Sequence, residues 1–458
     1  MPAEIIHCAW LLTMAEGAEP IQDAYVKIVD DKIVEVGPWQ DGVADDADVV
    51  TEMRTQLVLP GLVNTHTHAA MVLFRSLGDD YPLYTWLQEK IWPLEANLTA
   101  EDVYYGTRLA INEMLCSGTT TFADQYFFMD EVAEAVAEAG IRAVLSRGLL
   151  GSDAEVETKL EEAIEQAKKW KGKADGRITA MLGPHAPYTL SPAALRQIVT
   201  AARHYQLSLH IHVAETRDEL EEIGKNYGKR PVAYLAEHGL FSRPVLMAHG
   251  VWLDEGEIAY LAKQKVAVAH NPSSNMKLAS GIAPVAQLLK AGVTVSLGTD
   301  GAASNNRLDM FTELRTASLL QKVANSDPTV LPAETVLKMA TINGARALGL
   351  GDQIGSLEPG KKADLIGVDL ERDHLTPCFN PVSLLVYSAR GSDVSAVMVN
   401  GKWLVKEGRI LAGDEQKVRT AAAACAKRLT QLQSGNKVNL VKNGGKTSKN
   451  DLEGRNKS

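Results

Sequence analysis

The sequence is poor in features that mark several classes of protein. Its four cysteines among 458 residues are far apart and form no Cys-x-x-Cys pair, which argues against a disulfide framework and against a cysteine metal site. No apolar stretch approaches the roughly 18 residues of a membrane span, and the N-terminus lacks the basic and apolar regions of a signal peptide. We therefore expect a protein of the cytoplasm with no membrane partner.

Basic residues are outnumbered by acidic ones, with 47 Lys and Arg against 57 Asp and Glu. The formal net charge is −10, which argues against a nucleic-acid partner, because phosphate binding needs concentrated Lys and Arg. The cations are unevenly placed, since residues 434–458 hold six Lys and Arg against two acidic residues. This tail has few large apolar groups, so we predict that it is disordered. A nucleic-acid or membrane tether is the alternative, but the tail has no aromatic residue to support it.

Apolar material is ample, at 45% of the residues, so the chain can bury a core. Residues 1–58 and 360–415 show short alternating apolar runs that are typical of antiparallel strands, with Asn400-Gly401 as a hairpin signal. We expect both ends of the chain to meet in one small composite β-sandwich domain. A helix is predicted over 416–433, either as a cap on the main domain or as an interface in a homo-oligomer.

The middle of the chain, residues 59–359, alternates short apolar strands with longer helical stretches, which is typical of parallel βα units. Eight strands are predicted, which favours an α/β fold, a (β/α)8 TIM barrel, over an open sheet. The predicted strands cover 56–64, 119–123, 142–146, 178–182, 207–213, 245–248, 266–269 and 293–297.

Polar residues follow these strands where a barrel of this kind carries its active site. The strand ends supply His66, His68, Asp124, Arg147, His185, His212, His249, His270 and Asp300. A single histidine at a strand end is more often structural, but many at one rim predict a site.

His66 and His68 have the spacing of two ligands to one metal ion, because residues two apart on a strand project to the same face. His210 and His212 repeat that spacing. A further histidine and Asp300 would complete an open site, for which imidazole favours zinc, with iron or cobalt as alternatives.

Glu215 follows His212 by three residues, where the chain can turn its carboxylate toward a metal-activated water. We predict Glu215 as a proton shuttle, His249 as a group that orients the water, and Asp300 as both ligand and base. The structural alternative for Glu215 is an acid at a helix N-terminus, as Asp218, Glu219, Glu221 and Glu222 are expected to be.

Several motifs resemble those of the amidohydrolase superfamily, and within it the 5-methylthioadenosine/S-adenosylhomocysteine deaminases. They cover most of residues 1–430 and comprise Pro60–His68, Gly183–Tyr188, His212–Thr216, His249-Gly250, His270–Leu278 and Gly298–Asn306. The resemblance implies one zinc ion at His66, His68, His212 and Asp300, with Glu215 and His249 in proton transfer. No lysine follows the fourth strand to bridge a second metal.

The resemblance also implies a small-molecule nucleoside as substrate and hydrolytic deamination of its adenine ring. Glu95 would accept hydrogen bonds from the ribose hydroxyls, His185 would contact the purine, and Arg147 would pair with the carboxylate of S-adenosylhomocysteine. From sequence alone Glu95 is equally a surface acid. The acidic segment after Gly151 departs from the family pattern and favours methylthioadenosine, 5′-deoxyadenosine or adenosine as substrate.

Two alternatives stay open at this point. One is a related hydrolase that acts on triazines or on guanine, for which Glu95 would have no ribose to bind. The other is a metal-binding barrel without catalysis, against which Glu215, His249 and Asp300 together argue, because a structural metal site is closed. The roles of Asn275 and Lys277, in a loop after the seventh strand, are not decided by the sequence.

Overall fold

The strands form two sheets of eight strands each in the computed structural model, which describes residues 3–444. One sheet is parallel throughout and follows the chain order from β5 to β12. Its strands are β5 (Leu62–Thr67), β6 (Thr119–Tyr126), β7 (Arg142–Leu149), β8 (Ile178–Pro184), β9 (Ser208–Val213), β10 (Val245–His249), β11 (Ala267–His270) and β12 (Thr294–Leu297). The predicted (β/α)8 barrel is therefore confirmed.

The two edge strands of this sheet meet and close the barrel. The Thr65 hydroxyl donates to the Leu297 carbonyl at 2.9 Å, and the Asp300 amide donates to the His66 carbonyl at 2.9 Å. Apolar side chains such as Val63, Val144 and Leu246 fill the interior, where Ala345 of helix α14 (Ile342–Ala347) joins them. The barrel is thus a packed core whose open end carries the polar strand ends.

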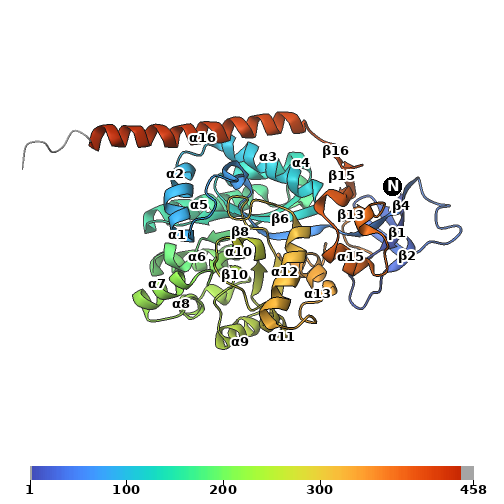
Figure 1. Ribbon diagram of the computed structural model, residues 1–458, viewed down its shortest axis with the longest axis horizontal. Coiled ribbons are helices and arrows are strands. Elements are labelled where there is room, and N and C mark those ends of the chain that lie inside the picture. Colours follow the sequence, from blue (N-terminus) through green and yellow to red (C-terminus); the bar gives the residue numbers. More distant parts are fainter. Residues whose placement is uncertain (1–2, 445–458) are drawn as a thin grey trace, which may run out of the picture.

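Helices surround the barrel and connect its strands (Figure 1). The longer ones are α3 (Ala100–Cys116), α4 (Met129–Ala139), α5 (Asp153–Trp170), α6 (Pro192–Tyr205), α7 (Arg217–Tyr227), α9 (Glu255–Lys263) and α12 (Met310–Asn325). The shorter ones include η1 (Ala69–Phe74), α1 (Leu83–Trp86), η2 (Leu87–Ile91), α2 (Trp92–Glu95), α8 (Pro231–Glu237), α10 (Pro272–Lys277), α11 (Val285–Lys290), α13 (Ala333–Met339) and α15 (Pro381–Tyr387).

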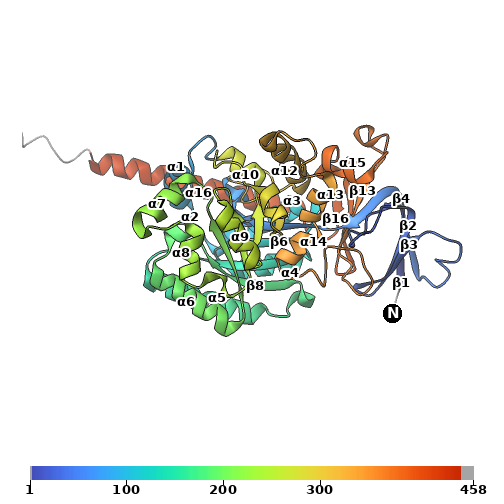
Figure 2. The same ribbon diagram turned by 90° about the horizontal axis from the view of Figure 1, so that it is seen from below.

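The second sheet combines both ends of the chain, in the order β16-β15-β14-β13-β4-β1-β2-β3. Its strands are β1 (Ala3–Leu11), β2 (Ile21–Val29), β3 (Lys32–Pro38), β4 (Val49–Pro60), β13 (Leu365–Asp369), β14 (Val394–Val399), β15 (Lys402–Lys406) and β16 (Arg409–Ile410). In Figures 1 and 2 the blue and orange-red strands lie side by side at one end of the molecule. The prediction that both ends share one sheet is confirmed.

This composite sheet curls, so that its two halves approach each other. Its core therefore lies between two parts of the same sheet, as the core of a β-sandwich lies between two sheets. The Ile33 amide donates to the Lys361 carbonyl at 2.9 Å, and Lys32 pairs with Lys362 in an isolated bridge. The enclosed apolar cluster includes Val26 and Met398.

The first predicted strand of the barrel, 56–64, is in fact two strands that belong to different sheets. Strand β4 ends at Pro60 in the composite sheet, and β5 begins at Leu62 in the barrel. Gly61 between them has no room for a side chain, because a Cβ there would lie 2.1 Å from the Thr120 hydroxyl oxygen. Residues 56–64 were predicted as one strand, although Pro60-Gly61, a pair typical of turns, interrupts the apolar run at this break.

The last described element is α16 (Glu415–Gly444), which packs along α3 on the outside of the barrel and extends past it in Figure 1. Val418, Ala422, Cys425 and Leu429 face the body and are buried, at a helical spacing. The helix continues beyond the predicted end at 433 into the segment predicted to be disordered, since each added residue of a formed helix gains a backbone hydrogen bond. Residues 445–458 of that segment lie outside the described residues.

None of the helices within residues 3–444 combines the length and the apolar character that crossing a membrane requires.

Candidate active site

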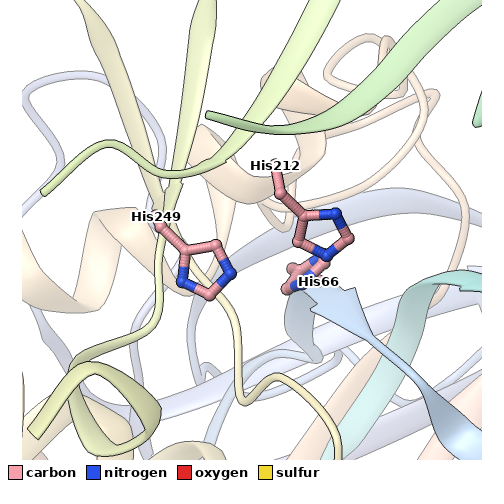
Figure 3. A group of neighbouring side chains, drawn as sticks. All are labelled: His66, His212 and His249. Carbon is pink, nitrogen blue, oxygen red and sulfur yellow. The ribbon is translucent and has the colours of Figure 1, made fainter. Parts of the chain in front are cut away.

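Side chains from several strand ends of the barrel converge on one small region. The Asp300 Oδ1 atom lies 3.5 Å from His66 Nε2 and 3.4 Å from His68 Nε2, and His68 Nε2 lies 3.3 Å from His212 Nε2. Figure 3 shows His66, His212 and His249, from three different strands, directed toward one another. The structure thus brings together all four residues predicted as metal ligands.

Hydrogen bonds at Nδ1 orient the imidazoles of His68 and His212, so that their Nε2 atoms face this region. His68 Nδ1 lies 2.6 Å from the Gln125 carbonyl oxygen, and His212 Nδ1 lies 2.7 Å from the His185 carbonyl oxygen. A carbonyl oxygen only accepts, so these Nδ1 atoms carry the proton and leave a lone pair on Nε2. These nitrogens are therefore prepared to bind a cation.

His66 is fixed by His210, whose Nε2 lies 2.8 Å from His66 Nδ1. His210 thus supports another histidine instead of contributing a ligand of its own, although its spacing to His212 matches that of His66 and His68. The buried Nε2 atom of His66 has no hydrogen-bond partner. Because a buried polar atom is seldom left unpaired, this nitrogen fits a metal ligand.

Asp300 is oriented by three donors. Its Oδ2 accepts from the hydroxyls of Ser274 at 2.6 Å and Ser304 at 2.9 Å, and its Oδ1 accepts from the Gly301 amide at 2.7 Å. Desolvation acts to raise the pKa of Asp300, but the contact with His66 and the charges of nearby histidines hold that pKa well below its usual range. The carboxylate is therefore ionised, as a ligand to a cation must be.

Glu215 and His249 lie beside this group, with 3.7 Å between Glu215 Oε2 and His249 Nε2. Desolvation raises the pKa of Glu215, while His249 opposes the increase. Burial acts to lower the pKa of His249, but the charges of Glu215 and Asp300 outweigh it and raise that pKa. A carboxyl group with a raised pKa is suited to take up and release a proton near neutral pH.

Asn275 and Lys277, which the sequence left undecided, have different positions. Asn275 Oδ1 lies 2.9 Å from His249 Nδ1, so Asn275 orients that imidazole. The Lys277 ammonium, at the end of α10, donates to Asp79 Oδ1 at 2.5 Å, to the Ala303 carbonyl and to Asn306, and so ties α10 to two loops. Lys277 is not among the residues that line the cavity.

The site opens into a cavity lined by residues from the strand ends and from the helices that precede α3. One side, here called the strand-end wall, consists of His68, His212, Glu215, His249 and Asp300. The other, the helical wall, comes from α1, η2 and α2 and consists of Leu83, Trp86, Leu87, Ile91, Trp92 and Glu95. These two groups of lining residues therefore differ, the first being polar and the second mostly apolar.

Of the five residues predicted to bind substrate, four line this cavity, namely Glu95, His185, Glu215 and Asp300. Glu95 is the one charged residue of the helical wall, and desolvation raises the pKa of its carboxyl group. His185 lies with its ring centre 4.9 Å from that of His212, and its Nδ1 is 3.2 Å from the Thr189 hydroxyl.

Arg147, the fifth, does not line the cavity in the structure, and its contact with substrate stays a prediction. Side chains alternate along β7, and Ser146 faces the barrel interior, with its hydroxyl 3.5 Å from His210 Nδ1. Arg147 therefore faces the surrounding helices, where its Nε donates to Glu162 Oε2 at 3.2 Å. The sequence placed Arg147 correctly at the end of a strand, but it did not show which face of that strand lines the barrel.

The aromatic residues of the helical wall were not predicted. Aromatic residues make up only 6% of the chain, yet Tyr81, Tyr84, Trp86 and Trp92 lie within twelve residues of one another. This concentration was the available signal, since aromatic side chains supply much of the contact area in ligand sites.

Known proteins share much of this sequence and fold. The model of the amidohydrolase family matches residues 57–404, which is most of the chain. The chain belongs to the amidohydrolase family. The match begins at the end of β4 and ends in β15, so it includes the whole barrel and part of the composite sheet.

Named amidohydrolases and a solved structure are similar over almost the full chain. A 5-methylthioadenosine/S-adenosylhomocysteine deaminase of Desulforudis audaxviator is 55% identical over 84% of this chain and 90% of its own. A 5′-deoxyadenosine deaminase of Methanosarcina acetivorans is 51% identical over 93% of this chain and 98% of its own. An adenosine deaminase from Xanthomonas campestris, solved with bound zinc, is 37% identical, with a TM-score of 0.89 over 93% of this chain and 98% of that one.

Proposed function

We propose that this amidohydrolase deaminates 5′-substituted adenosines, converting the adenine ring to hypoxanthine and releasing ammonia. Three similar proteins, described above, are named as deaminases of adenosine, 5′-deoxyadenosine or methylthioadenosine and S-adenosylhomocysteine. The observation that carries the proposal is the presence in one cavity of a metal-ligand set, a proton-transfer carboxyl at Glu215 and a separate carboxyl at Glu95. The ligand set supports hydrolysis, and Glu95 supports a nucleoside substrate.

His66, His68, His212 and Asp300 would hold one zinc ion, because they offer three imidazole nitrogens and an ionised carboxylate at short mutual distances. When bound, zinc supplies a hydroxide nucleophile at neutral pH. Iron and cobalt favour the same donors, and metal analysis of the purified protein distinguishes them.

The protein side chains supply the proton transfers. Glu215 takes one proton of the attacking water and delivers it to N1 of the adenine ring, which makes C6 more electrophilic. His249, held by Asn275, orients the attacking water through its Nε2. Asp300 takes the second water proton and passes it to the departing ammonia, and the two serine hydroxyls keep its carboxylate in position. General acid–base catalysis of this kind contributes about 10²- to 10⁴-fold to rate.

The remaining cavity residues bind the nucleoside. Glu95 accepts hydrogen bonds from the 2′- and 3′-hydroxyls of the ribose, and His185 contacts the purine. The apolar side chains Leu83, Trp86 and Leu87 favour an uncharged 5′ substituent. Arg147 faces Glu162, so the cavity offers no guanidinium from β7 to the carboxylate of S-adenosylhomocysteine. We therefore rank methylthioadenosine, 5′-deoxyadenosine and adenosine above S-adenosylhomocysteine.

The test is to measure bound metal and then to compare kcat/KM for these four nucleosides by ultraviolet absorbance. We expect deamination of at least the three with uncharged 5′ groups. A metal-loaded protein that leaves all four unchanged would exclude the proposal. Activity on guanine or a chlorotriazine instead would favour the related hydrolases, and no activity on any compound would favour a non-catalytic barrel.

We also propose a cytoplasmic location, which the four free cysteines support, because unpaired thiols are typical of reducing compartments. A homo-oligomer stays a prediction that analytical ultracentrifugation can test.

A further inference from the structure

The turn after β9 has an unusual backbone conformation and carries Glu215 into the site. Ala214 has a φ of 54°, in the left-handed region that residues with a Cβ seldom adopt. Its carbonyl oxygen accepts hydrogen bonds from the amides of Val251 at 3.0 Å and Trp252 at 2.9 Å, in the loop that follows His249. This turn is therefore held from one side by the segment that carries the neighbouring catalytic histidine.

Glu219 holds the same turn from the other side. Its Oε1 accepts from the Ala214 amide at 2.8 Å, and its Oε2 accepts from the Glu215 amide at 2.9 Å. Both peptide planes that flank Ala214 are thus fixed by one carboxylate. Only 1% of the Glu219 surface is exposed, so water does not compete for these hydrogen bonds.

Ordinary helix capping does not account for this arrangement. Thr216 is the N-cap of α7, and its hydroxyl accepts from the Glu219 amide at 3.3 Å. In a capping box the glutamate three residues later would bond back to the N-cap amide. Glu219 instead reaches the two preceding amides, while Asp218 and Glu221 of the same helix are exposed, as helix-dipole acids usually are. Glu219 therefore stabilises the turn at Ala214 more than it stabilises the N-terminus of α7.

We infer that Glu219 is a positioning residue that acts through Glu215. By fixing the Ala214 turn, it directs the Glu215 carboxyl toward His249 and the metal-ligand set. This inference rests on the proposed proton-transfer function of Glu215, and it assigns to Glu219 no contact with substrate or metal.

The test compares Glu219→Gln in wild-type and Glu215→Gln backgrounds. Glutamine has the same shape, but its NH₂ group cannot accept a hydrogen bond, so one of the two amides loses its partner. We expect kcat to fall about 10- to 100-fold with KM nearly unchanged, because small misplacements of a catalytic group reduce kcat by such factors. In the Glu215→Gln background, Glu219→Gln should cause no further fall in kcat.

A matched control and a rescue complete the design. Glu221→Gln changes an exposed acid of the same helix and should leave kcat unchanged. Adding Ala214→Gly to Glu219→Gln should recover part of kcat, because glycine adopts the left-handed conformation without the Cβ penalty. Zinc content and melting temperature are measured for every variant.

Several results would overturn the inference. These are an unchanged kcat in Glu219→Gln, equal losses in both backgrounds, or a Glu219→Gln protein that loses its fold or its zinc, which would show a general structural role. Failure of the proposed function is a different result, because wild type and Glu221→Gln would then both leave every nucleoside unchanged.

Discussion

Side chains on the strand-end wall of the cavity are held by hydrogen bonds, whereas those on the helical wall are held by packing. His68 and His212 are each fixed by a backbone carbonyl, and Asp300 by two serine hydroxyls. On the helical wall, Leu83, Trp86 and Ile91 are buried in the main apolar core.

The two walls suit different tasks, the chemical reaction on one side and the selection of the substrate on the other. A hydrolytic reaction needs donor atoms placed within a few tenths of an ångström, which only oriented polar groups can supply. Selection among nucleosides needs shape and apolar area, with one polar group to recognise the ribose. We therefore expect changes to the strand-end wall to lower kcat and changes to the helical wall to raise KM.

The largest effect should come from Glu215→Gln on the strand-end wall. It removes the proton shuttle but none of the predicted metal ligands, so kcat should fall about 10²- to 10⁴-fold while zinc content stays equal to that of wild type. Steady-state kinetics and metal analysis check this, and full activity in the variant would remove Glu215 from the mechanism.

A smaller effect is expected from Glu95→Gln on the helical wall. Hydrogen bonds to a charged group contribute about 1.5–3 kcal/mol, so kcat/KM for adenosine should fall about 10- to 100-fold. The same change should not affect 2′,3′-dideoxyadenosine, which lacks both ribose hydroxyls. Equal losses for the two nucleosides would mean that Glu95 does not recognise the ribose.

Leu87→Ala should raise KM for methylthioadenosine about fivefold and leave kcat nearly unchanged, because roughly 1 kcal/mol of apolar contact is lost from a half-buried side chain. Leu319→Ala, which changes an exposed leucine of α12, is the control and should have no effect. A fall in kcat instead would contradict the division between the two walls.

The smallest effect should follow from Arg147→Ala. Because Arg147 faces Glu162 outside the cavity, the ratio of kcat/KM for S-adenosylhomocysteine to that for methylthioadenosine should change by no more than about twofold. A selective loss of S-adenosylhomocysteine activity would show that this side chain turns into the cavity when that substrate binds.

What the sequence could predict differs between the two walls of the cavity. The parallel barrel and its polar strand ends follow from a short-range pattern, an apolar run and then a histidine or aspartate, and this pattern identified His66, His212 and Asp300. The hairpin at Asn400-Gly401 was predicted for a similar reason, since its two left-handed residues are ones that tolerate this conformation.

Other features depend on tertiary contacts. The helical wall is built from three short helical segments, α1, η2 and α2, whose apolar residues carry no motif. The outward direction of Arg147 depends on which face of β7 lines the barrel. The break at Gly61 depends on the closeness of Thr120, and the role of Asn275 depends on its distance from His249.

Strand β4, which leads into β5 at Gly61, is synthesised long before one of its two partner strands. Strand β4 pairs with β1 on one side and with β13 on the other, and β13 lies about 300 residues later in the chain. At about 5–20 residues per second, the ribosome needs roughly 15 to 60 s to supply that second partner. Until then, a β1–β4 pair would have Leu57–Leu59 on an unpaired edge. The strand that leads directly to His66 and His68, two of the predicted metal ligands, thus gains its second partner only after most of the chain has been made.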